Sequence, residues 1–232
     1  MSEPNNPSYP VSVMDHRVMN RVLRHRLRNL CAGVKMTMER IAAATAVSNP
    51  QIGPRCDIVV AEIDNLRDMT SRMDLLFDQL PTSHAKSLFE IVTAIRTAFV
   101  PKFPFCKLAF DGPEAMVSFV HGDWLIFALS ELIFNAGEGS GDTAEVSFSW
   151  KNDSNGFTFS IDNGSAIPPE IPTTPPVPFM TSKSRHDGLG LAIAWRICEA
   201  IGASLQIETM PGEEDAHTRI TINLPAAEIN HA

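Results

Sequence analysis

Apolar side chains recur every three or four positions through the first third of the chain. The first stripe, which has no internal proline, consists of Met19, Leu23, Leu27, Leu30, Val34, Met38 and Ile41. The second stripe, which Pro81 ends, consists of Val59, Ile63, Leu66, Met69, Met73, Leu76 and Leu80. This spacing predicts a long helix with one buried face, the breaking segment SNPQIGP at 48–54, and a second helix. Together they form a predicted helical hairpin over residues 12–80.

The hairpin is predicted to pair with a second copy. Two helices of this length expose too much apolar surface to stand alone, and their near-heptad spacing favours a four-helix bundle. We therefore expect a homodimer. Residues 1–11, rich in Pro, Asn and Ser, are expected to form a disordered lead ahead of it.

After Pro81 the pattern changes to alternating elements, which predicts a second domain over residues 81–232. Helices are expected over 84–99, 122–138 and 187–201, and strands near 106–110, 115–120, 144–150, 156–162, 203–209 and 217–224. The Pro- and Ser-rich loop at 163–186 is long enough to be a functional lid. The predicted fold class is α+β: a helical hairpin followed by an α/β sandwich.

Charge and composition narrow the range of partners. A net charge of −8 argues against general binding to nucleic acid or to an anionic membrane surface. No apolar run approaches the ~20 residues of a membrane-spanning helix, and the N-terminus does not resemble a signal peptide, so a cytoplasmic protein is expected. The four cysteines form no CxxC pair, so we interpret them as small apolar residues.

One histidine of the first predicted helix, His25, lies among five arginines. The arginines around His25 are Arg17, Arg21, Arg24, Arg26 and Arg28. Like charges three and four positions apart repel, so either the helix tolerates a loss of stability or an anion binds there. At ~100° per residue, His25 lies about 160° from Leu27 on the apolar stripe and is expected to face solvent. Asn29, one turn later, shares its face.

Four short motifs follow one another in the second domain. ELIFNAGE places Glu131 and Asn135 one helical turn apart, DNGSAI (162–167) follows a predicted strand, PFMTSK (178–183) lies in the loop, and DGLGLAI (187–193) leads into a helix. Each is weak by itself. In this order and spacing they resemble the N, G1, F and G2 boxes of the catalytic domain of sensor histidine kinases, part of the GHKL superfamily of ATPases. The resemblance covers roughly residues 84–225.

The resemblance implies an ATP site that also holds Mg²⁺. The amide oxygen of Asn135 would be a ligand for Mg²⁺, which prefers hard oxygen donors. Asp162 would accept a hydrogen bond from the adenine amino group, and Gly164 would let the backbone pass close to the base.

The phosphate end of the implied site involves the loop and the helix that follows it. Gly188 and Gly190 would turn backbone N–H groups toward the phosphates at a helix start. Lys183, in the loop, would add a point charge beside them.

The segment HRLRN at 25–29 resembles the phosphoacceptor motif of the same family in four of five places. The resemblance implies a soluble, dimeric two-component histidine kinase that autophosphorylates His25 from ATP. The phosphoryl group would pass to an aspartate on the receiver domain of a response regulator, and the arginines would favour the anion on His25. No sensor domain is expected ahead of the hairpin, so the signal would come from a separate sensor protein, the N-terminal segment or the dimer itself.

Several positions depart from the family pattern. Arg26 stands where an acidic residue is usual, Leu30 replaces the common proline, His186 replaces the first glycine of the G2 box, and Glu138 replaces a frequent basic residue. These departures leave an alternative open: a histidine phosphotransferase or response-regulator phosphatase with a weakened ATP domain. Asn29 suits that role, because its amide can orient an attacking water.

Two further hypotheses follow from single residues. Glu131, four residues before Asn135, resembles the water-activating residue of the superfamily's chaperone, gyrase and mismatch-repair members, which would make the protein an ATPase or switch. The chain lacks the transducer domain of those proteins. His16 is a rival phosphoacceptor, but it has no downstream Asn and lies nearer the start of the helix.

Overall fold

The computed structural model describes residues 13–140, 145–153, 156–167, 175–183, 186–210 and 217–231. The predicted disordered lead at 1–11 lies outside these residues. The chain divides into two compact units, Met1–Gln79 and Leu80–Ala232, which are described separately below.

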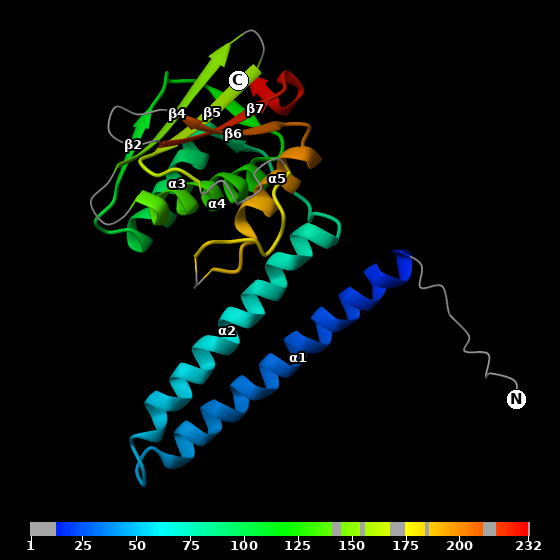
Figure 1. The fold of residues 1–232 in the computed structure, drawn as a ribbon, viewed down its shortest axis with the longest axis vertical. Coiled ribbons are helices and arrows are strands. Elements are labelled where there is room, and N and C mark those ends of the chain that lie inside the picture. Colours follow the sequence, from blue (N-terminus) through cyan, green and yellow to red (C-terminus); the bar gives the residue numbers. More distant parts are fainter. Residues whose placement is uncertain are drawn as a thin grey trace, which may run out of the picture. The chain divides into compact units, whose positions relative to one another are not determined.

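The first unit contains two long helices joined by a short turn (Figure 1). Helix α1 spans Val13–Thr45 and helix α2 spans Ile52–Phe77, which confirms the predicted helical N-terminal region. Helix α2 begins earlier than its apolar stripe suggests. Pro54 falls in its first turn, where a backbone N–H has no helical partner and a proline is tolerated.

The apolar stripe of α1 is only partly covered within one chain. Leu27 is half-buried, whereas Met19, Leu23 and Leu30 are 53%, 57% and 63% exposed. Contact with one neighbouring helix covers only a narrow face, on which Cys31 is fully buried. Val34 and Met38 are half-buried as well, and the exposed apolar side chains of α1 lie on the surface of the single hairpin.

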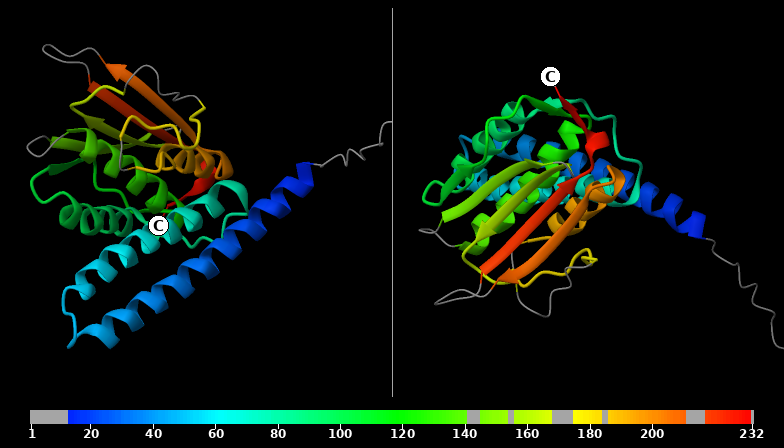
Figure 2. Two further views of the ribbon diagram at one scale, coloured as in Figure 1. Left: turned by 60° about the horizontal axis from the view of Figure 1, so that its bottom comes forward. Right: turned by 90° about the horizontal axis from the view of Figure 1, so that it is seen from above.

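The second unit is an α/β sandwich, as predicted. Its elements are β1 (Lys86–Ser87), α3 (Leu88–Lys102), β2 (Lys107–Asp111), β3 (Val117–Phe119), α4 (Gly122–Ser140), β4 (Glu145–Asp153), β5 (Gly156–Asn163), α5 (Gly190–Ala200), β6 (Ser204–Met210), β7 (His217–Leu224), a 3-10 turn (Ala226–Glu228) and β8 (Ile229–His231). The main sheet has the order β2-β4-β5-β7-β6, and a small sheet has the order β1-β3-β8. Helices α3, α4 and α5 lie on one face of the main sheet (Figures 1 and 2).

Along the strands of the main sheet, mainly apolar side chains alternate with polar ones. Side chains on the helix-covered face, paired across the strands, are Val146, Phe148, Trp150, Phe157, Phe159, Ile161, Asn163, Thr218, Ile220, Ile222 and Leu224. Those on the opposite face are Ser147, Ser149, Thr158, Ser160, Asp162, Arg219 and Thr221. Phe148 and Phe159 are fully buried and stack with ring centroids 5.5 Å apart. The apolar face is the core of this domain.

The start of α3 and the short strands β1 and β8 differ from the sequence-based prediction. The helix expected from residue 84 begins at Leu88, because Ser87 caps it: the Ser87 hydroxyl accepts from the backbone N–H of Glu90, and the Glu90 carboxylate accepts from the backbone of Ser87. Residues 86–87 instead form β1, which pairs with β3. Strand β8 was not predicted, since three residues carry too little pattern to identify.

Candidate functional site

The first group of candidate residues lies on α1. His25 is exposed, as its position on the helix predicts, and its Nε2 lies 3.3 Å from the amide nitrogen of Asn29. The side chains of His16 and Arg17 lie outside the described part of the chain. An exposed imidazole beside an amide is compatible with a group that accepts or donates a phosphoryl unit.

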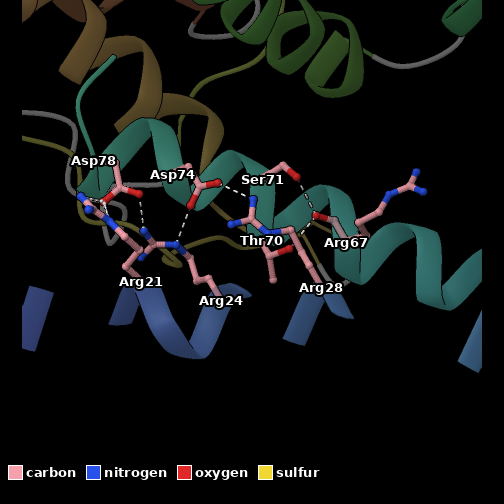
Figure 3. Close-up of polar contacts among 8 residues, drawn as sticks. All are labelled: Arg21, Arg24, Arg28, Arg67, Thr70, Ser71, Asp74 and Asp78. Carbon is pink, nitrogen blue, oxygen red and sulfur yellow. Dashed lines mark hydrogen bonds and ion pairs between the residues drawn. The ribbon is translucent and has the colours of Figure 1, made fainter. Parts of the chain in front are cut away.

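Three of the arginines near His25 form ion pairs with two carboxylates of α2 (Figure 3). Arg24 donates from Nε to Asp74 and from Nη2 to Asp78, each at 2.7 Å. Arg28 pairs with Asp74 at 2.5 Å and Arg21 with Asp78 at 3.2 Å. Each of these three arginines therefore has a carboxylate partner within the hairpin.

Arg24 is the central member of this network. Only 3% of it is exposed, although its charge is permanent. A buried guanidinium is tolerated when carboxylates pair with it, and removal of one partner leaves a buried charge uncompensated. Burial favours a higher pKa for Asp78, but hydrogen bonds from Arg24 and Arg21 outweigh it and hold the pKa of Asp78 below its usual range.

The second group lies at the C-terminal end of α4. Glu131 and Asn135, one turn apart, are both half-buried. The side chain of Lys183 reaches this helix from the loop: its Nζ lies 3.2 Å from Asn135 Oδ1 and 3.2 Å from Glu138 Oε2. The structure thus brings Lys183 to Asn135 and Glu138, which precede it by more than 40 residues in the sequence.

The donor set at this position fits a divalent cation. Asn135 Oδ1 is a hard oxygen that contacts an ammonium group, so a Mg²⁺ ion could use the same oxygen. Within the described ranges, no group of three or more His, Cys, Asp or Glu side chains is arranged to hold a metal by itself. A metal bound here would therefore take most of its ligands from phosphates and water.

At the end of β5, the neighbouring residues Asp162 and Asn163 lie on opposite faces of the main sheet. Asp162 lies on the polar face of the sheet, where Arg219 Nε donates to it at 2.7 Å. Asn163 lies on the helix-covered face, is 7% exposed, and donates to the hydroxyl of Ser165 at 2.8 Å. A Cβ atom placed on Gly139 of α4 would come within 3.2 Å of the Asn163 amide, which shows how closely that amide faces the helix.

The glycines of the last motif shape the loop before α5. Gly188 has φ of +67°, and a Cβ atom there would lie 2.8 Å from the backbone of Phe179, so glycine is required. Gly190 is the first residue of α5, whose N-cap, Leu189, makes no capping bond through its side chain. First-turn N–H groups of a helix favour anions. A Cβ atom on Gly164, by contrast, would meet nothing within 4 Å.

The sequence analysis did not identify four residues that take part in the contacts described above. They are Asp74, Asp78, Asn163 and Arg219. The first two are spaced by four on the second apolar helix, which is the signal for a carboxylate pair facing the arginines. Asn163 is in phase with Phe157, Phe159 and Ile161 in the sequence, so the strand alternation itself indicates its face.

The class of the second domain follows from comparison with known families. Residues 121–228 match the family described as "Histidine kinase-, DNA gyrase B-, and HSP90-like ATPase". The match lies within the second domain, where the four motifs predicted it.

The chain as a whole is related to sensory histidine kinases. It is 22% identical over 227 residues to the "Sensory histidine kinase/phosphatase NtrB" of Rhizobium meliloti (strain 1021), covering 89% of this chain and 57% of the relative. A protein of the same name from Vibrio alginolyticus is 36% identical over 64 residues, 28% of this chain and 17% of the relative. The chain thus spans little more than half the length of the first relative and a small part of the second.

Solved structures share the fold. A full-length ShkA structure, described as a complex with AMPPNP, has a TM-score of 0.68 at 14% identity and covers 93% of this chain and 46% of that one. The mycobacterial sensor histidine kinase MprB has a TM-score of 0.55 at 19% identity and covers 62% of this chain and 97% of that one. None of the helices in the described ranges combines the length and apolar character needed to cross a membrane.

The ion pairs of Asp78 predict a pH dependence of hairpin stability. Its lowered pKa means that Asp78 stabilises the folded chain above the unfolded pKa of about 3.9, and that this contribution is lost as pH falls through the folded pKa. We expect Asp78→Asn to cost about 1–2 kcal/mol near pH 7 and progressively less below pH about 4. Thermal unfolding of the full chain at several pH values measures this.

The control for that measurement is Asp68→Asn, because Asp68 is 69% exposed and pairs with its neighbour Arg67 in the same helix. A cost of Asp78→Asn that is the same at pH 7 and pH 3 would contradict the role assigned to its ion pairs.

Proposed function

We propose that this chain is a soluble, cytoplasmic two-component histidine kinase that transfers the γ-phosphoryl group of ATP to His25 and then to an aspartate of a response regulator. The observation that carries the proposal is the combination, in one chain, of an exposed histidine with an adjacent amide on a helical hairpin and an ATPase-family domain. The name of the related NtrB proteins supports the same reading.

The proposed reaction forms one bond and breaks one. An unprotonated imidazole nitrogen of His25 attacks the γ-phosphorus, the bond from phosphorus to the bridging oxygen breaks, and ADP leaves. Asn29 would orient the ring. When bound, Mg²⁺ supplies charge compensation to the phosphates, and Asn135 would be its ligand from the protein.

The nucleotide would contact the second domain at three positions. The start of α5, with Gly188 and Gly190, would hold phosphates through backbone N–H groups, and Lys183 would add its charge. Gly164, at the end of β5, leaves open space beside the backbone for the base. Glu131 would assist from the same helical face as Asn135.

A second function is favoured by one specific observation. Arg26 stands next to His25 where the family has an acid that helps to activate the histidine, and the two carboxylates of α2 near this end, Asp74 and Asp78, are engaged by arginines. Weak activation of His25 would make the protein a histidine phosphotransferase or a response-regulator phosphatase, in which Asn29 orients the attacking water.

Transfer of label from ATP separates these functions. With ATP labelled at the γ-phosphate and Mg²⁺, we expect an acid-labile label on the wild-type chain and at least a tenfold loss of label in His25→Gln, because that substitution removes the proposed acceptor nitrogen. The control His16→Gln should retain the label.

The other outcomes are equally informative. Label that remains in His25→Gln contradicts the proposed acceptor. Label acquired only from a phosphorylated receiver domain indicates the phosphotransferase, and phosphate released to water at the same rate in both proteins indicates an ATPase.

The proposed homodimer would bury the apolar side chains that α1 leaves exposed. We expect Leu30→Glu to convert dimer to monomer, because Leu30 is 63% exposed in the single hairpin and a charge would be buried in the bundle. Light scattering measures the mass. Val47→Glu, at a residue that is 99% exposed in the turn after α1, is the matched control. A wild-type monomer, or an unchanged dimer in Leu30→Glu, would refute the pairing.

Substitutions of Asp162 and Asn163 can test which of these two residues contacts the adenine base. The family pattern proposes Asp162, whereas the strand alternation favours Asn163, which faces α4. We expect Asn163→Ala to weaken ATP binding by about tenfold, the effect of one lost hydrogen bond, and Asp162→Asn to weaken it less. Isothermal titration calorimetry measures the ATP affinity of both variants. A larger loss of affinity in Asp162→Asn than in Asn163→Ala would indicate that Asp162 contacts the base.

A further inference from the structure

Two lysines and one histidine converge on one carboxylate at the end of α4. Glu138, whose side chain is 17% exposed, lies 3.2 Å from Lys183 Nζ and 3.5 Å from His186 Nδ1 through Oε2. Its other oxygen, Oε1, lies 3.5 Å from Lys102 Nζ. Lys102 belongs to α3, whereas Lys183 and His186 come from the loop that precedes α5.

The position of Glu138 explains why it collects cations. The C-terminal end of a helix carries partial negative charge, so a carboxylate in the last turn of α4 is unfavourable unless positive groups surround it. Lys102 also lies 4.4 Å from the centroid of the Phe134 ring on the same helix, which holds its ammonium group at this end of α4.

The hydrogen bonds of Lys183 are fully used in this arrangement. An ammonium group has three donors, and Lys183 Nζ has three acceptors within 3.3 Å: the backbone oxygen of Asn135, its side-chain oxygen and Glu138 Oε2. A phosphate can therefore bind Lys183 only by replacing one of these acceptors. The carboxylate is the acceptor that a phosphate resembles in charge.

We infer that Glu138 competes with the phosphates of a bound nucleotide for Lys183, and thereby sets how strongly the domain distinguishes nucleotides by their number of phosphates. This inference rests on the proposed nucleotide binding. In the exchange, Lys183 turns from Glu138 to a phosphate oxygen, while Lys102 stays paired with the carboxylate and keeps it compensated. Glu138 also repels each additional phosphate charge, so its effect grows from adenosine to ADP to ATP.

Substitution of the carboxylate by an amide tests the competition. We expect Glu138→Gln to bind Mg-ATP about three- to tenfold more tightly than wild type, Mg-ADP with a smaller gain, and adenosine with no gain. Isothermal titration of the full chain with each of the three compounds measures this order. In the Lys183→Met background, Glu138→Gln should lose most of its gain, because the group competed for is gone.

A matched control separates the local effect from the change in net charge. Glu145→Gln makes the same charge change on β4, where Glu145 pairs with Lys107 at 2.7 Å, and should leave all three affinities unchanged. Circular dichroism verifies the fold of each variant. Should Glu138→Gln fold poorly, Glu138→Asp, which withdraws the carboxylate from Lys183, is expected to show the same order with a smaller gain.

The outcomes distinguish this inference from the proposed function. Wild-type binding of Mg-ATP with no gain in Glu138→Gln, or an equal gain for adenosine, overturns the competition and leaves nucleotide binding in place. A persistent full gain in the Lys183→Met background overturns it as well. A wild-type chain that binds none of the compounds refutes both.

Discussion

Burial of one face of the main sheet beneath α3, α4 and α5 is the constraint on which the ATPase-family domain depends. Each large side chain buried there contributes about 1.5–3 kcal/mol relative to exposure, and Phe148, Phe159 and Ile161 are all buried to within 1%. Because side chains alternate along a strand, a slip of one residue would expose this entire set. The register is therefore fixed, and with it the face on which every polar residue at the strand ends must lie.

The helical hairpin follows a different physical rule, in which charge pairing accompanies a narrow apolar contact. Arg24 is buried between the helices and two carboxylates of α2 balance it, so these ion pairs determine how α1 and α2 align near His25. Such pairs contribute specificity more than stability, since their desolvation offsets much of their attraction. One consequence matters for function. The arginines that face α2 are occupied, and His25 stays on the exposed side of the helix.

The end of α4 shows how one changed residue redistributes charge in a site. Where the family frequently has a basic residue, this chain has Glu138, and cations from two other segments approach it instead. One of these residues is Lys183, a loop residue that contacts Asn135 as well. A loop residue can change partners more readily than one in the middle of a helix, because fewer contacts hold it.

Most of the helices and strands could be predicted from the spacing of apolar residues along the sequence. The two helices of the hairpin, the three helices and the main strands of the second domain, and the family of that domain were all predicted, since long periodic segments and four ordered motifs carry strong signals. The short strands β1 and β8 could not be, because two or three residues contain too little pattern. The start of α3 was misplaced because the capping box of Ser87 and Glu90 was overlooked.

The sequence by itself determined which residue types were available: a histidine with an amide one turn later, an N-box asparagine, glycines at a helix start. Tertiary structure decided which of them meet. The pairing of Arg24 with Asp74 joins positions 50 residues apart, and that of Lys183 with Glu138 joins positions 45 apart. Local propensity contains no information about such contacts, because they arise only when burial of apolar faces brings separate elements together.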